Sequence, residues 1–332
     1  MRVAINGFGR IGRLVFRTLA QRHPELEVVA INDLTDATTN AHLLKYDSNY
    51  GGYPGTVEVD GDHMTVDGAS IRVLAQRDWD ELPWGDLDVQ VALECTGVGT
   101  GRAMAGKHLA AGAKKVLISA PSGDADAMIV LGVNDDIYDA AKHHVVSNAS
   151  CTTNGLAPPV SVVHNEFGIV KGQMTTVHSY TGGQAILDTQ KKDLRDARSG
   201  AMNIVPASTG AARAIGMVIP ELHGRLDGAA YRVPTPTVSI VEFVVLLEKS
   251  ATADEINARL RAAAEGRLAG ILDVSDEPLV SLDLKGNEHS SIVDAGSTMV
   301  VDGNLAKIAA WYDNEWGYAS RLADMAAFLS KN

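Results

Sequence analysis

The chain has 332 residues, of which 45% are hydrophobic and 21% are charged. This composition is ordinary for a globular protein and excludes a disordered or fibrous chain, and the length favours two domains. Its 29 Lys and Arg residues against 41 Asp and Glu residues give a formal net charge of −12. Because such a charge repels nucleic acids and anionic membranes on average, we expect neither as a partner.

The cysteines and the N-terminal sequence bear on the compartment. Cys95 and Cys151 are the only cysteines, which is too few for a disulfide framework, and no four-ligand Cys/His spacing surrounds them. We therefore expect a reducing compartment and no metal. The N-terminus, MRVAINGFGRIG, lacks the apolar core of a signal peptide, and no apolar run approaches the ~18 residues needed to span a bilayer. The expected location is the cytoplasm.

The first half of the chain alternates β-rich runs with helical segments. A helix is expected from Arg10 to Gln21, and the β-rich runs are RVAIN, EVVAIND, VQVALECTG, KKVLIS and MIVLGVN. This alternation predicts an α/β domain with a mostly parallel sheet and crossover helices. The segment TVEVDGDHMTVDGASIRVLA has turn signals at Asp60-Gly61 and Asp67-Gly68, which predict antiparallel strands appended to that sheet.

The pattern changes after Cys151. KGQMTTVHSYT and TVSIVEFVVLLEK read as long strands, and the polar, aperiodic segment between Gly182 and Val205 is typical of a functional or interfacial loop. Thr252 and Glu255 form a capping box for a helix that runs to Gly266.

A final amphipathic helix is expected over residues 316–330. We predict a Rossmann domain over residues 1–150 and an α+β domain with a large, mostly antiparallel sheet over residues 151–315. The C-terminal helix, 316–332, is expected to pack back on the first domain.

A dinucleotide signal lies at the N-terminus. Gly7, Gly9 and Gly12 form G-x-G-x-x-G directly after a predicted strand and before an amphipathic helix. Such glycines allow a tight turn and a close approach of backbone to pyrophosphate at a helix N-terminus, although glycine-rich turns also serve as plain structure. Asp33 ends the second strand, where a carboxylate can bind the adenosine ribose, and Leu34 offers no donor to a 2′-phosphate. This favours NAD over NADP; the alternative is that Asp33 is only a turn residue.

Cys151 lies among hydroxyl residues in SNASCTTN, whereas a packing cysteine usually lies among aliphatic ones. The following segment predicts a helix with Ser150 as its N-cap, kinked by Pro158 and Pro159. A cysteine in the first turn would be favoured as thiolate by the helix dipole. His178, in TVHSYT, is a candidate base or imidazolium partner.

Residue type alone leaves purely structural roles open for His178 and Cys95. His178 could be a core histidine satisfied by a carbonyl group. Cys95, at the end of a strand and without a catalytic partner nearby, is interpreted as a small buried residue.

Motifs in order over essentially the whole chain identify a family: NGFGRIGR, INDL, LISAPS, SNASCTTN, TVHSYT, PASTGAAR, YRVPTPTVS and AWYDNEWGY. Together they resemble phosphorylating glyceraldehyde-3-phosphate dehydrogenases of type I. The resemblance implies NAD-dependent oxidative phosphorylation of D-glyceraldehyde 3-phosphate to 1,3-bisphosphoglycerate, in glycolysis or gluconeogenesis. It also implies a homotetramer, with residues 180–205 as its S-loop.

The resemblance implies the site roles as well. Cys151 would attack the aldehyde to form a thiohemiacetal, His178 would take up the hydroxyl proton, and inorganic phosphate would cleave the resulting thioester. The residues similar to the family's phosphate sites are Thr181, Arg195 and Arg232 for the substrate phosphate, and Ser150, Thr152, Thr209 and Gly210 for the attacking phosphate. Singly, each could instead have a turn or surface role.

Cofactor contacts are implied in the same way. The matching residues are Gly7, Gly9, Arg10, Ile11 and Gly12 in the pyrophosphate turn, Asp33 at the ribose, Arg77 and Ser119 as further contacts, and Asn314 at the nicotinamide carboxamide.

Five residues at three places in the chain depart from the family pattern. Gly155 stands where a second cysteine is often found, so oxidised Cys151 is expected to lack rescue by a disulfide to that position. Gly182-Gly183 should loosen the turn after Thr181. Thr189-Gln190 replaces a Leu-Pro pair often found in NAD-specific members, which leaves the degree of NAD selectivity open. These changes could also mark an isoform with altered sensitivity to thiol-directed inhibitors.

Other classes of protein share parts of this pattern. Aspartate-semialdehyde and acyl-phosphate reductases also use a Rossmann domain and a cysteine, but TVHSYT with PASTGAAR argues against them. Erythrose-4-phosphate dehydrogenase shares most motifs and stays open. A regulatory protein with the NAD fold is disfavoured by the intact Cys151, His178 and Arg232, and a cysteine hydrolase would need no dinucleotide turn.

Overall fold

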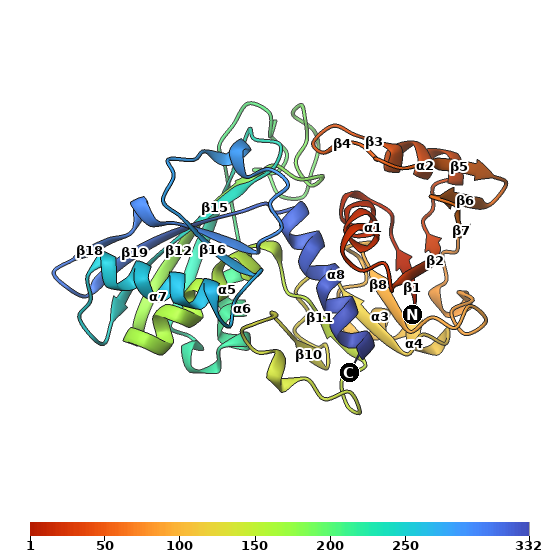
Figure 1. Cartoon of the computed structure of the whole chain (residues 1–332). Helices are drawn as coiled ribbons and strands as arrows, with labels where there is room; N and C mark the ends of the chain where they lie inside the picture. Colours follow the sequence, from red (N-terminus) through yellow and green to blue (C-terminus); the bar gives the residue numbers. More distant parts are fainter. Residues whose placement is uncertain (332) are drawn as a thin grey trace. The chain divides into compact units, whose positions relative to one another are not determined.

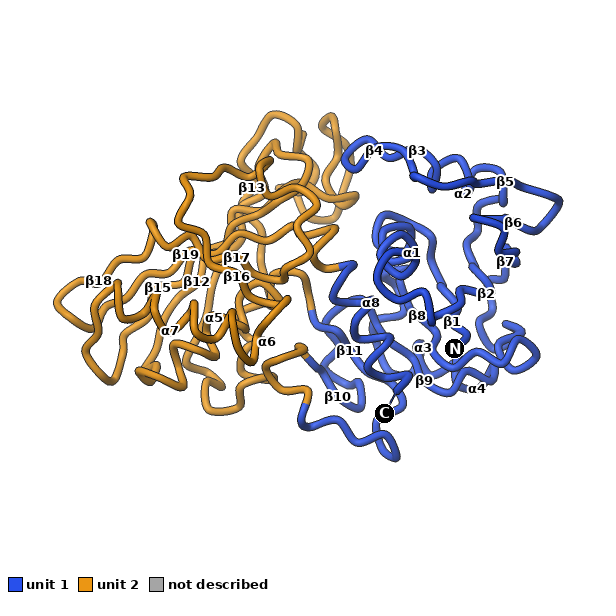
Figure 2. Tube along the Cα trace, in the orientation of Figure 1, with its two compact units in different colours: residues 1–129, 136–149, 319–332 blue, residues 130–135, 150–318 orange. Residues whose placement is uncertain are grey.

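The structure is a computed structural model that describes residues 1–331, and the chain forms two compact units (Figure 2). The first unit comprises residues 1–129, 136–149 and 319 onward; the second comprises residues 130–135 and 150–318. No helix among residues 1–331 has both the length and the apolarity that crossing a membrane requires.

A nine-stranded sheet forms the centre of the first unit, in the order β10-β11-β9-β8-β1-β2-β7-β6-β5 (Figure 1). Its strands are β1 (Arg2–Asn6), β2 (Glu27–Asn32), β5 (Val57–Asp60), β6 (His63–Val66), β7 (Ala69–Leu74), β8 (Val91–Glu94), β9 (Lys115–Ile118), β10 (Ala127–Met128) and β11 (Val145–Ser147). All pairs from β10 to β7 are parallel, and β5, β6 and β7 pair antiparallel. This confirms both the parallel sheet and its antiparallel extension.

The remaining elements of this unit connect the strands. They are the helices α1 (Arg10–Arg22), α2 (Ala37–Lys45), α3 (Arg102–Ala105) and α4 (Lys107–Ala110), the short pair β3 (Tyr46–Asp47) and β4 (Gly51–Gly52), and the 3-10 helices Trp79–Glu81 and Asp135–Ile137, the latter beginning in the second unit. The expected strand MIVLGVN is mostly wrong: only β10 pairs, and Ile129 and Val130 are buried without strand pairing.

The C-terminal helix α8 (Trp316–Lys331) contributes its residues from Ala319 onward to the first unit. It lies beside α1 (Figure 1), where Thr18 Oγ1 donates to the Ala319 carbonyl oxygen at 3.2 Å. Arg22 on α1 also pairs with Asp324 at 3.1 Å. These contacts place α8 against the Rossmann sheet's first crossover helix.

The second unit is built on an eight-stranded mixed sheet, in the order β13-β14-β12-β15-β19-β17-β16, with β18 beside β19. Its strands are β12 (Ile169–Ser179), β13 (Val205–Ala207), β14 (Leu226–Val233), β15 (Ser239–Leu247), β16 (Leu272–Ser275), β17 (Ser291–Asp294), β18 (Met299–Val301) and β19 (Leu305–Tyr312). Antiparallel pairs predominate, and only β12–β14 and β16–β17 among the described pairs are parallel. The predicted sheet type is confirmed.

Helices cover this second sheet. They are α5 (Cys151–Phe167), α6 (Ala211–Val218) and α7 (Ala253–Glu265), with 3-10 helices at Pro220–Leu222, Ser281–Leu284 and Ala295–Ser297. Helix α5 packs against β17 and β19, and α6 and α7 pack against α5. The helix α5 continues through Pro158 and Pro159, although neither proline can donate a backbone hydrogen bond. The capping box of Thr252 and Glu255 is present at the start of α7.

Residues 180–204 form neither a helix nor a named strand, as the aperiodic sequence predicts. A single bridge between Ala185 and Ser199 joins its two arms. The loop exposes apolar side chains to solvent: Ile186, Leu187, Leu194, Met202 and Ile204 are 69–80% exposed.

Candidate functional site

The glycine turn after β1 is shaped for close backbone approach. Gly7 has φ +89°, a conformation that side chains disfavour, and a Cβ atom on Gly12 would lie 2.1 Å from the Gly7 carbonyl oxygen. Gly9 is the N-cap of α1 and gives the helix no side-chain cap. The first-turn N–H groups of α1 are therefore available to an anion, such as a pyrophosphate.

Asp33 follows β2 and holds this turn. Its Oδ2 accepts from the Phe8 N–H at 2.7 Å, and its Oδ1 accepts from the Thr35 N–H at 3.0 Å. A carboxylate has about four acceptor sites, so the structural bonds leave capacity for ribose hydroxyl groups. The turn role and the ligand role of Asp33 are thus compatible.

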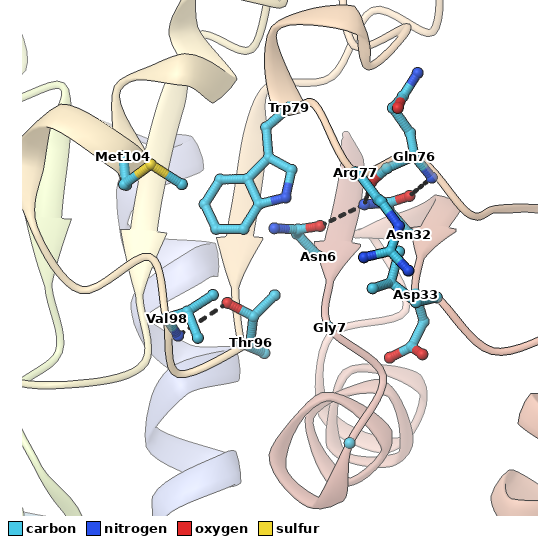
Figure 3. A pocket seen from close by; sticks show the side chains of 13 residues that line it. Asn6, Gly7, Asn32, Asp33, Gln76, Arg77, Trp79, Thr96, Val98 and Met104 are labelled. Carbon is cyan, nitrogen blue, oxygen red and sulfur yellow. Dashed lines mark hydrogen bonds between the residues drawn. The ribbon is translucent and has the colours of Figure 1, made fainter.

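A pocket of ≈ 460 Å³ opens at the carboxyl ends of β1, β2 and β8. Ligands of parallel α/β sheets bind at this edge. Figure 3 shows Asp33 near one end of the pocket and the Trp79 ring with Met104 toward the other. The lining residues are Asn6, Gly7, Gly9, Asn32, Asp33, Leu34, Gln76, Arg77, Trp79, Cys95, Thr96, Val98 and Met104.

A buried polar network supports this pocket. Trp84 Nε1 donates to His108 Nδ1 at 3.0 Å, so the proton of a neutral His108 lies on Nε2, which is 3.1 Å from Glu94 Oε2. The Glu94 carboxylate also accepts from Asn6 Nδ2 at 2.5 Å and from the Thr96 N–H at 2.9 Å. Sequence reasoning missed this network, because its members lie up to 102 positions apart.

The other predicted cofactor residues lie in the first unit with different environments. Arg10 pairs with Asp47, so its side chain is engaged within the unit. Ile11 lies in the first turn of α1, and Arg77 is exposed on the pocket rim. The Ser119 N–H donates to the Glu94 carbonyl oxygen at 3.0 Å, which places it at the end of β9.

Cys151 is the first residue of α5, as predicted. Ser150 is the N-cap, and its Oγ accepts from the Thr153 N–H at 3.0 Å. Cys151 Sγ lies 3.5 Å from His178 Nε2 on β12, so the structure brings the two predicted residues together. Cys151 is half-buried and His178 is 4% exposed.

Burial governs the protonation of this pair. It raises the pKa of the Cys151 thiol, which the charge of Arg232 lowers only in part. Burial and, secondarily, Arg232 lower the pKa of His178 to about 3. Desolvation therefore opposes the thiolate form that the helix N-terminus was expected to favour. Burial thus favours a neutral thiol facing a neutral imidazole.

The tautomer of His178 follows from its other nitrogen. Nδ1 lies 2.7 Å from the Ser179 carbonyl oxygen, which can only accept, and it also contacts the guanidinium of Arg232, which can only donate. We assign the proton to Nδ1, because the carbonyl is fixed in the backbone whereas Arg232 is a flexible side chain. His178 Nε2 is then an unprotonated acceptor toward Cys151 Sγ.

The residues predicted for the substrate phosphate lie in two segments, with Arg232 on β14 and Thr181 and Arg195 in the 180–204 loop. Arg232, opposite His178 in the pairing of β14 with β12, has no carboxylate within ion-pair distance among residues 1–331. Arg195 and Thr181 lie in the exposed 180–204 loop, and Gln184 Oε1 accepts from Thr181 Oγ1 at 3.1 Å. Among residues 1–331, the Arg195 N–H donates to Asp193 Oδ1 at 2.8 Å, whereas the Arg232 guanidinium contacts His178, so no hydrogen-bond partner is shared by the two arginines.

The residues predicted for the attacking phosphate lie at the N-termini of two helices, α5 and α6. Thr152 Oγ1 is 2.9 Å from the Tyr312 hydroxyl, which is 2.8 Å from Thr176 Oγ1. Gly210 is the N-cap of α6, and Thr209 Oγ1 accepts from the Ala211 N–H at 3.1 Å. Tyr312 was not predicted from sequence, although it lies in the AWYDNEWGY motif.

Asn314 follows β19 and is 4% exposed. Its Oδ1 accepts from Ser179 Oγ at 2.8 Å and from Ser239 Oγ at 3.0 Å. Sequence reasoning singled out Asn314 but neither serine.

A parallel sheet with this glycine turn is typical of dinucleotide-binding domains, and together with the Cys151–His178 pair it points to the class of NAD-dependent oxidoreductases. Family profiles described as "Glyceraldehyde 3-phosphate dehydrogenase, NAD binding domain" and "Glyceraldehyde 3-phosphate dehydrogenase, C-terminal domain" match residues 1–102 and 150–314. The chain belongs to the glyceraldehyde-3-phosphate dehydrogenase family. NAD as the cofactor is thereby confirmed.

Similar proteins cover the whole chain. It is 57% identical over 330 residues to a glyceraldehyde-3-phosphate dehydrogenase of Geobacillus stearothermophilus, covering 99% of this chain and 98% of the relative. It is 57% identical over 331 residues to glyceraldehyde-3-phosphate dehydrogenase 1 of Bacillus subtilis, covering 100% and 98%. It is 53% identical over 330 residues to the Streptomyces coelicolor enzyme of that name, covering 99% and 98%.

Proposed function

We propose that this chain oxidises D-glyceraldehyde 3-phosphate with NAD and inorganic phosphate, yielding 1,3-bisphosphoglycerate, NADH and a proton, in glycolysis or gluconeogenesis. The single observation that carries the proposal is the 3.5 Å contact between Cys151 Sγ and His178 Nε2. It pairs a thiol nucleophile with a proton acceptor at a helix N-terminus, which is the arrangement that covalent aldehyde oxidation needs.

In the first step, Cys151 Sγ bonds to the aldehyde carbon. The thiol proton passes to His178 Nε2 and then to the carbonyl oxygen, which becomes the hydroxyl of a thiohemiacetal. His178 suits this task because its Nδ1–H donates to Ser179 O at 2.7 Å, which leaves Nε2 as the acceptor.

In the second step, His178 Nε2 takes up the hydroxyl proton as the carbon loses a hydride, and a thioester on Cys151 remains. Bound NAD supplies the hydride acceptor. A phosphate oxygen then attacks the thioester carbon, and the sulfur leaves and is reprotonated. The acyl phosphate conserves the energy of oxidation that hydrolysis would release.

Side chains with unsatisfied capacity support the two phosphate sites. Arg232 and Arg195 have no carboxylate partner among the described residues, and Arg232 Nε is buried without a hydrogen bond. Guanidinium groups of this kind bind phosphate with charge-assisted, forked contacts. We assign Thr181, Arg195 and Arg232 to the substrate phosphate. The attacking phosphate would bind at Ser150, Thr152, Thr209 and Gly210.

The cofactor residues fit NAD. The close contact between Gly12 and Gly7 leaves backbone N–H groups for the pyrophosphate, and Asp33 retains acceptor capacity for the ribose. The proposed contacts are Gly7, Gly9, Arg10, Ile11 and Gly12 at the pyrophosphate, Asp33 at the ribose, Arg77 and Ser119 beyond it, and Asn314 at the carboxamide. Arg10 would act through its backbone, because its side chain pairs with Asp47.

A homotetramer in the cytoplasm completes the proposal. The 180–204 loop exposes five apolar side chains at 69–80% of their surface. A set of this kind in one segment favours burial against another subunit. A reducing compartment fits two thiols that form no disulfide. Light scattering of the purified protein tests the assembly.

The test of the reaction is the rate of NADH formation from glyceraldehyde 3-phosphate and NAD, with and without inorganic phosphate, in the natural protein and in Cys151→Ala. The proposal requires fast turnover that depends on phosphate and disappears in the variant. Turnover indifferent to phosphate would remove the second half of the reaction, and turnover without the thiol would remove the covalent mechanism.

A further inference from the structure

The ends of β12, β15 and β19 meet at one edge of the second sheet. Ser179 is the last residue of β12, Ser239 is the first of β15, and Asn314 follows β19 by two residues. All three side chains are at most 4% exposed. In the antiparallel pairing of β15 with β19, Ser239 is opposite Tyr312, and β15 lies between the other two strands.

The serine hydroxyl groups have one acceptor between them. Ser179 Oγ donates to Asn314 Oδ1 at 2.8 Å, and Ser239 Oγ donates to the same oxygen at 3.0 Å. Ser239 Oγ itself accepts from the Ser179 N–H at 3.0 Å, which uses one of its two lone pairs. The two hydroxyl oxygens are 3.5 Å apart, at the limit of hydrogen bonding.

These bonds fix the orientation of the Asn314 amide. If the amide turned over, Nδ2 would face both serines, and the hydroxyl protons of Ser179 and Ser239 would lose their acceptor. Leaving such a buried donor unsatisfied is unfavourable, because it loses its hydrogen bonds to water without gaining a partner. Oδ1 is therefore saturated by the serines, whereas no described residue accepts from Nδ2.

We propose that Ser179 and Ser239 are positioning residues that lock Asn314 as a hydrogen-bond donor, so that the site recognises a carbonyl oxygen on the pyridine ring of the cofactor and not its amino group. This inference rests on the proposed function, in which Asn314 contacts the nicotinamide carboxamide. Within a planar carboxamide the oxygen and nitrogen are nearly the same size, so only a donor or acceptor of fixed identity distinguishes the two.

The same residue also serves the base through its backbone. The Ser179 carbonyl oxygen accepts from His178 Nδ1 at 2.7 Å, whereas the Ser179 hydroxyl faces Asn314. Replacing Ser179 by Ala removes the hydroxyl contact and keeps the carbonyl contact. The two functions can therefore be separated in one variant.

The experiment measures dissociation constants by calorimetry for NAD, for its 3-acetylpyridine analogue and for ADP-ribose. The acetyl analogue keeps the carbonyl oxygen and replaces the amino group by methyl, and ADP-ribose lacks the pyridine ring. The proteins are the natural enzyme, the double variant Ser179→Ala/Ser239→Ala, both single variants, Asn314→Ala and Ser161→Ala. Ser161 is a matched control, because it is a buried serine whose Oγ donates to the Pro158 carbonyl oxygen instead.

In the natural enzyme, NAD and the acetyl analogue are expected to bind within about threefold of each other. In the double variant, loss of the fixed donor should weaken the binding of NAD about threefold to tenfold relative to the binding of ADP-ribose. This is the equivalent of one neutral hydrogen bond. Binding of the acetyl analogue should weaken more than binding of NAD. A turned Asn314 amide can still accept a hydrogen bond from the amino group of NAD, whereas the acetyl analogue has no amino group. The single variants should show smaller changes of the same sign, and Ser161→Ala none.

The proposed lock is wrong if NAD and the acetyl analogue each bind the double variant as tightly as they bind the natural enzyme, while ADP-ribose binding is intact. ADP-ribose binding also reports folding, and if the double variant fails to bind it, the single variants decide the question. If Asn314→Ala leaves the ratio of NAD to ADP-ribose affinity unchanged, the proposed role of Asn314 itself fails. If Asn314→Ala weakens the binding of NAD but the serine variants do not, the role of Asn314 stands and its positioning by the two serines is wrong.

Discussion

His178 Nε2 lies 3.5 Å from Cys151 Sγ, although the two residues are 27 positions apart in the chain. The contact joins the first residue of α5 to the penultimate residue of β12. Because burial opposes charge on both groups, it favours a neutral pair at rest, in which the thiol becomes a thiolate by giving its proton to the imidazole. The reactivity of the thiol should therefore depend on His178.

Replacing His178 by Ala is expected to slow alkylation of Cys151 by iodoacetamide at pH 7 and to move the rise of the rate to higher pH. The thiol then has no proton acceptor, and its pKa is already raised by burial. Turnover should fall about 10²-fold to 10⁴-fold, as for loss of a general base. Alkylation rates between pH 5 and 10 check this. An unchanged profile would mean that His178 takes no proton from the thiol.

Arg232→Ala should raise the KM for glyceraldehyde 3-phosphate about tenfold to a hundredfold, because one charge-assisted contact to phosphate is lost. Oxidation of glyceraldehyde, which carries no phosphate, should change much less. Arg225→Ala is the control, since Arg225 on the preceding turn pairs with Glu248 at 3.8 Å. A similar loss with both aldehydes would show that Arg232 acts through His178 and not through the substrate phosphate.

Mild peroxide should convert Cys151 to sulfenic acid and then to higher oxides, without an internal disulfide. Gly155 supplies no thiol, and burial raises the pKa of Cys95 to about 12, so Cys95 is not a resolving thiol. Trapping with dimedone followed by peptide mass spectrometry checks this. A Cys151–Cys95 bridge as the main product would contradict it.

Asp324→Asn should destabilise the first unit at pH 7, by about 2 kcal/mol for a charged hydrogen-bond network. Burial acts to raise the pKa of Asp324, but Arg321, His23 and Arg22 outweigh it and hold the pKa below its ordinary value. A lowered carboxyl pKa contributes stability above the unfolded value and loses it as pH falls through the folded value. The difference in thermal midpoint should therefore shrink toward pH 3.

The control for this prediction is Asp276→Asn. Asp276 also pairs with an arginine, Arg261, but its side chain is 72% exposed. An exposed pair contributes little to stability. Equal effects of the two substitutions would show that the partial burial of Asp324 is irrelevant.

Local signals in the sequence were sufficient for much of the fold. The glycines after RVAIN predicted the turn between β1 and α1, and Ser150 predicted the N-cap of α5, because both depend on residues close in the chain. The MIVLGVN strand was wrong because an apolar run predicts burial, and burial here occurs without pairing beyond Met128.

The sequence did not predict the charge states of the site residues or the hydrogen bonds between residues far apart in the chain. The neutral state of Cys151 and His178 depends on desolvation, which requires the packed structure. The hydrogen bonds of Asn314 come from residues 135 and 75 positions away, and serines carry no signal that singles them out. The pairing of Cys151 with His178 was predicted only as a candidate from residue type and family resemblance.

The most direct test of the account is a single-turnover reaction without inorganic phosphate. Enzyme is mixed with NAD and excess glyceraldehyde 3-phosphate, NADH is followed by absorbance, and the quenched protein is analysed by mass spectrometry. The account predicts a burst of about one NADH per active site and an acyl group on the peptide that contains Cys151, released when phosphate is added. A burst without acylated Cys151, or an acyl group insensitive to phosphate, would contradict it.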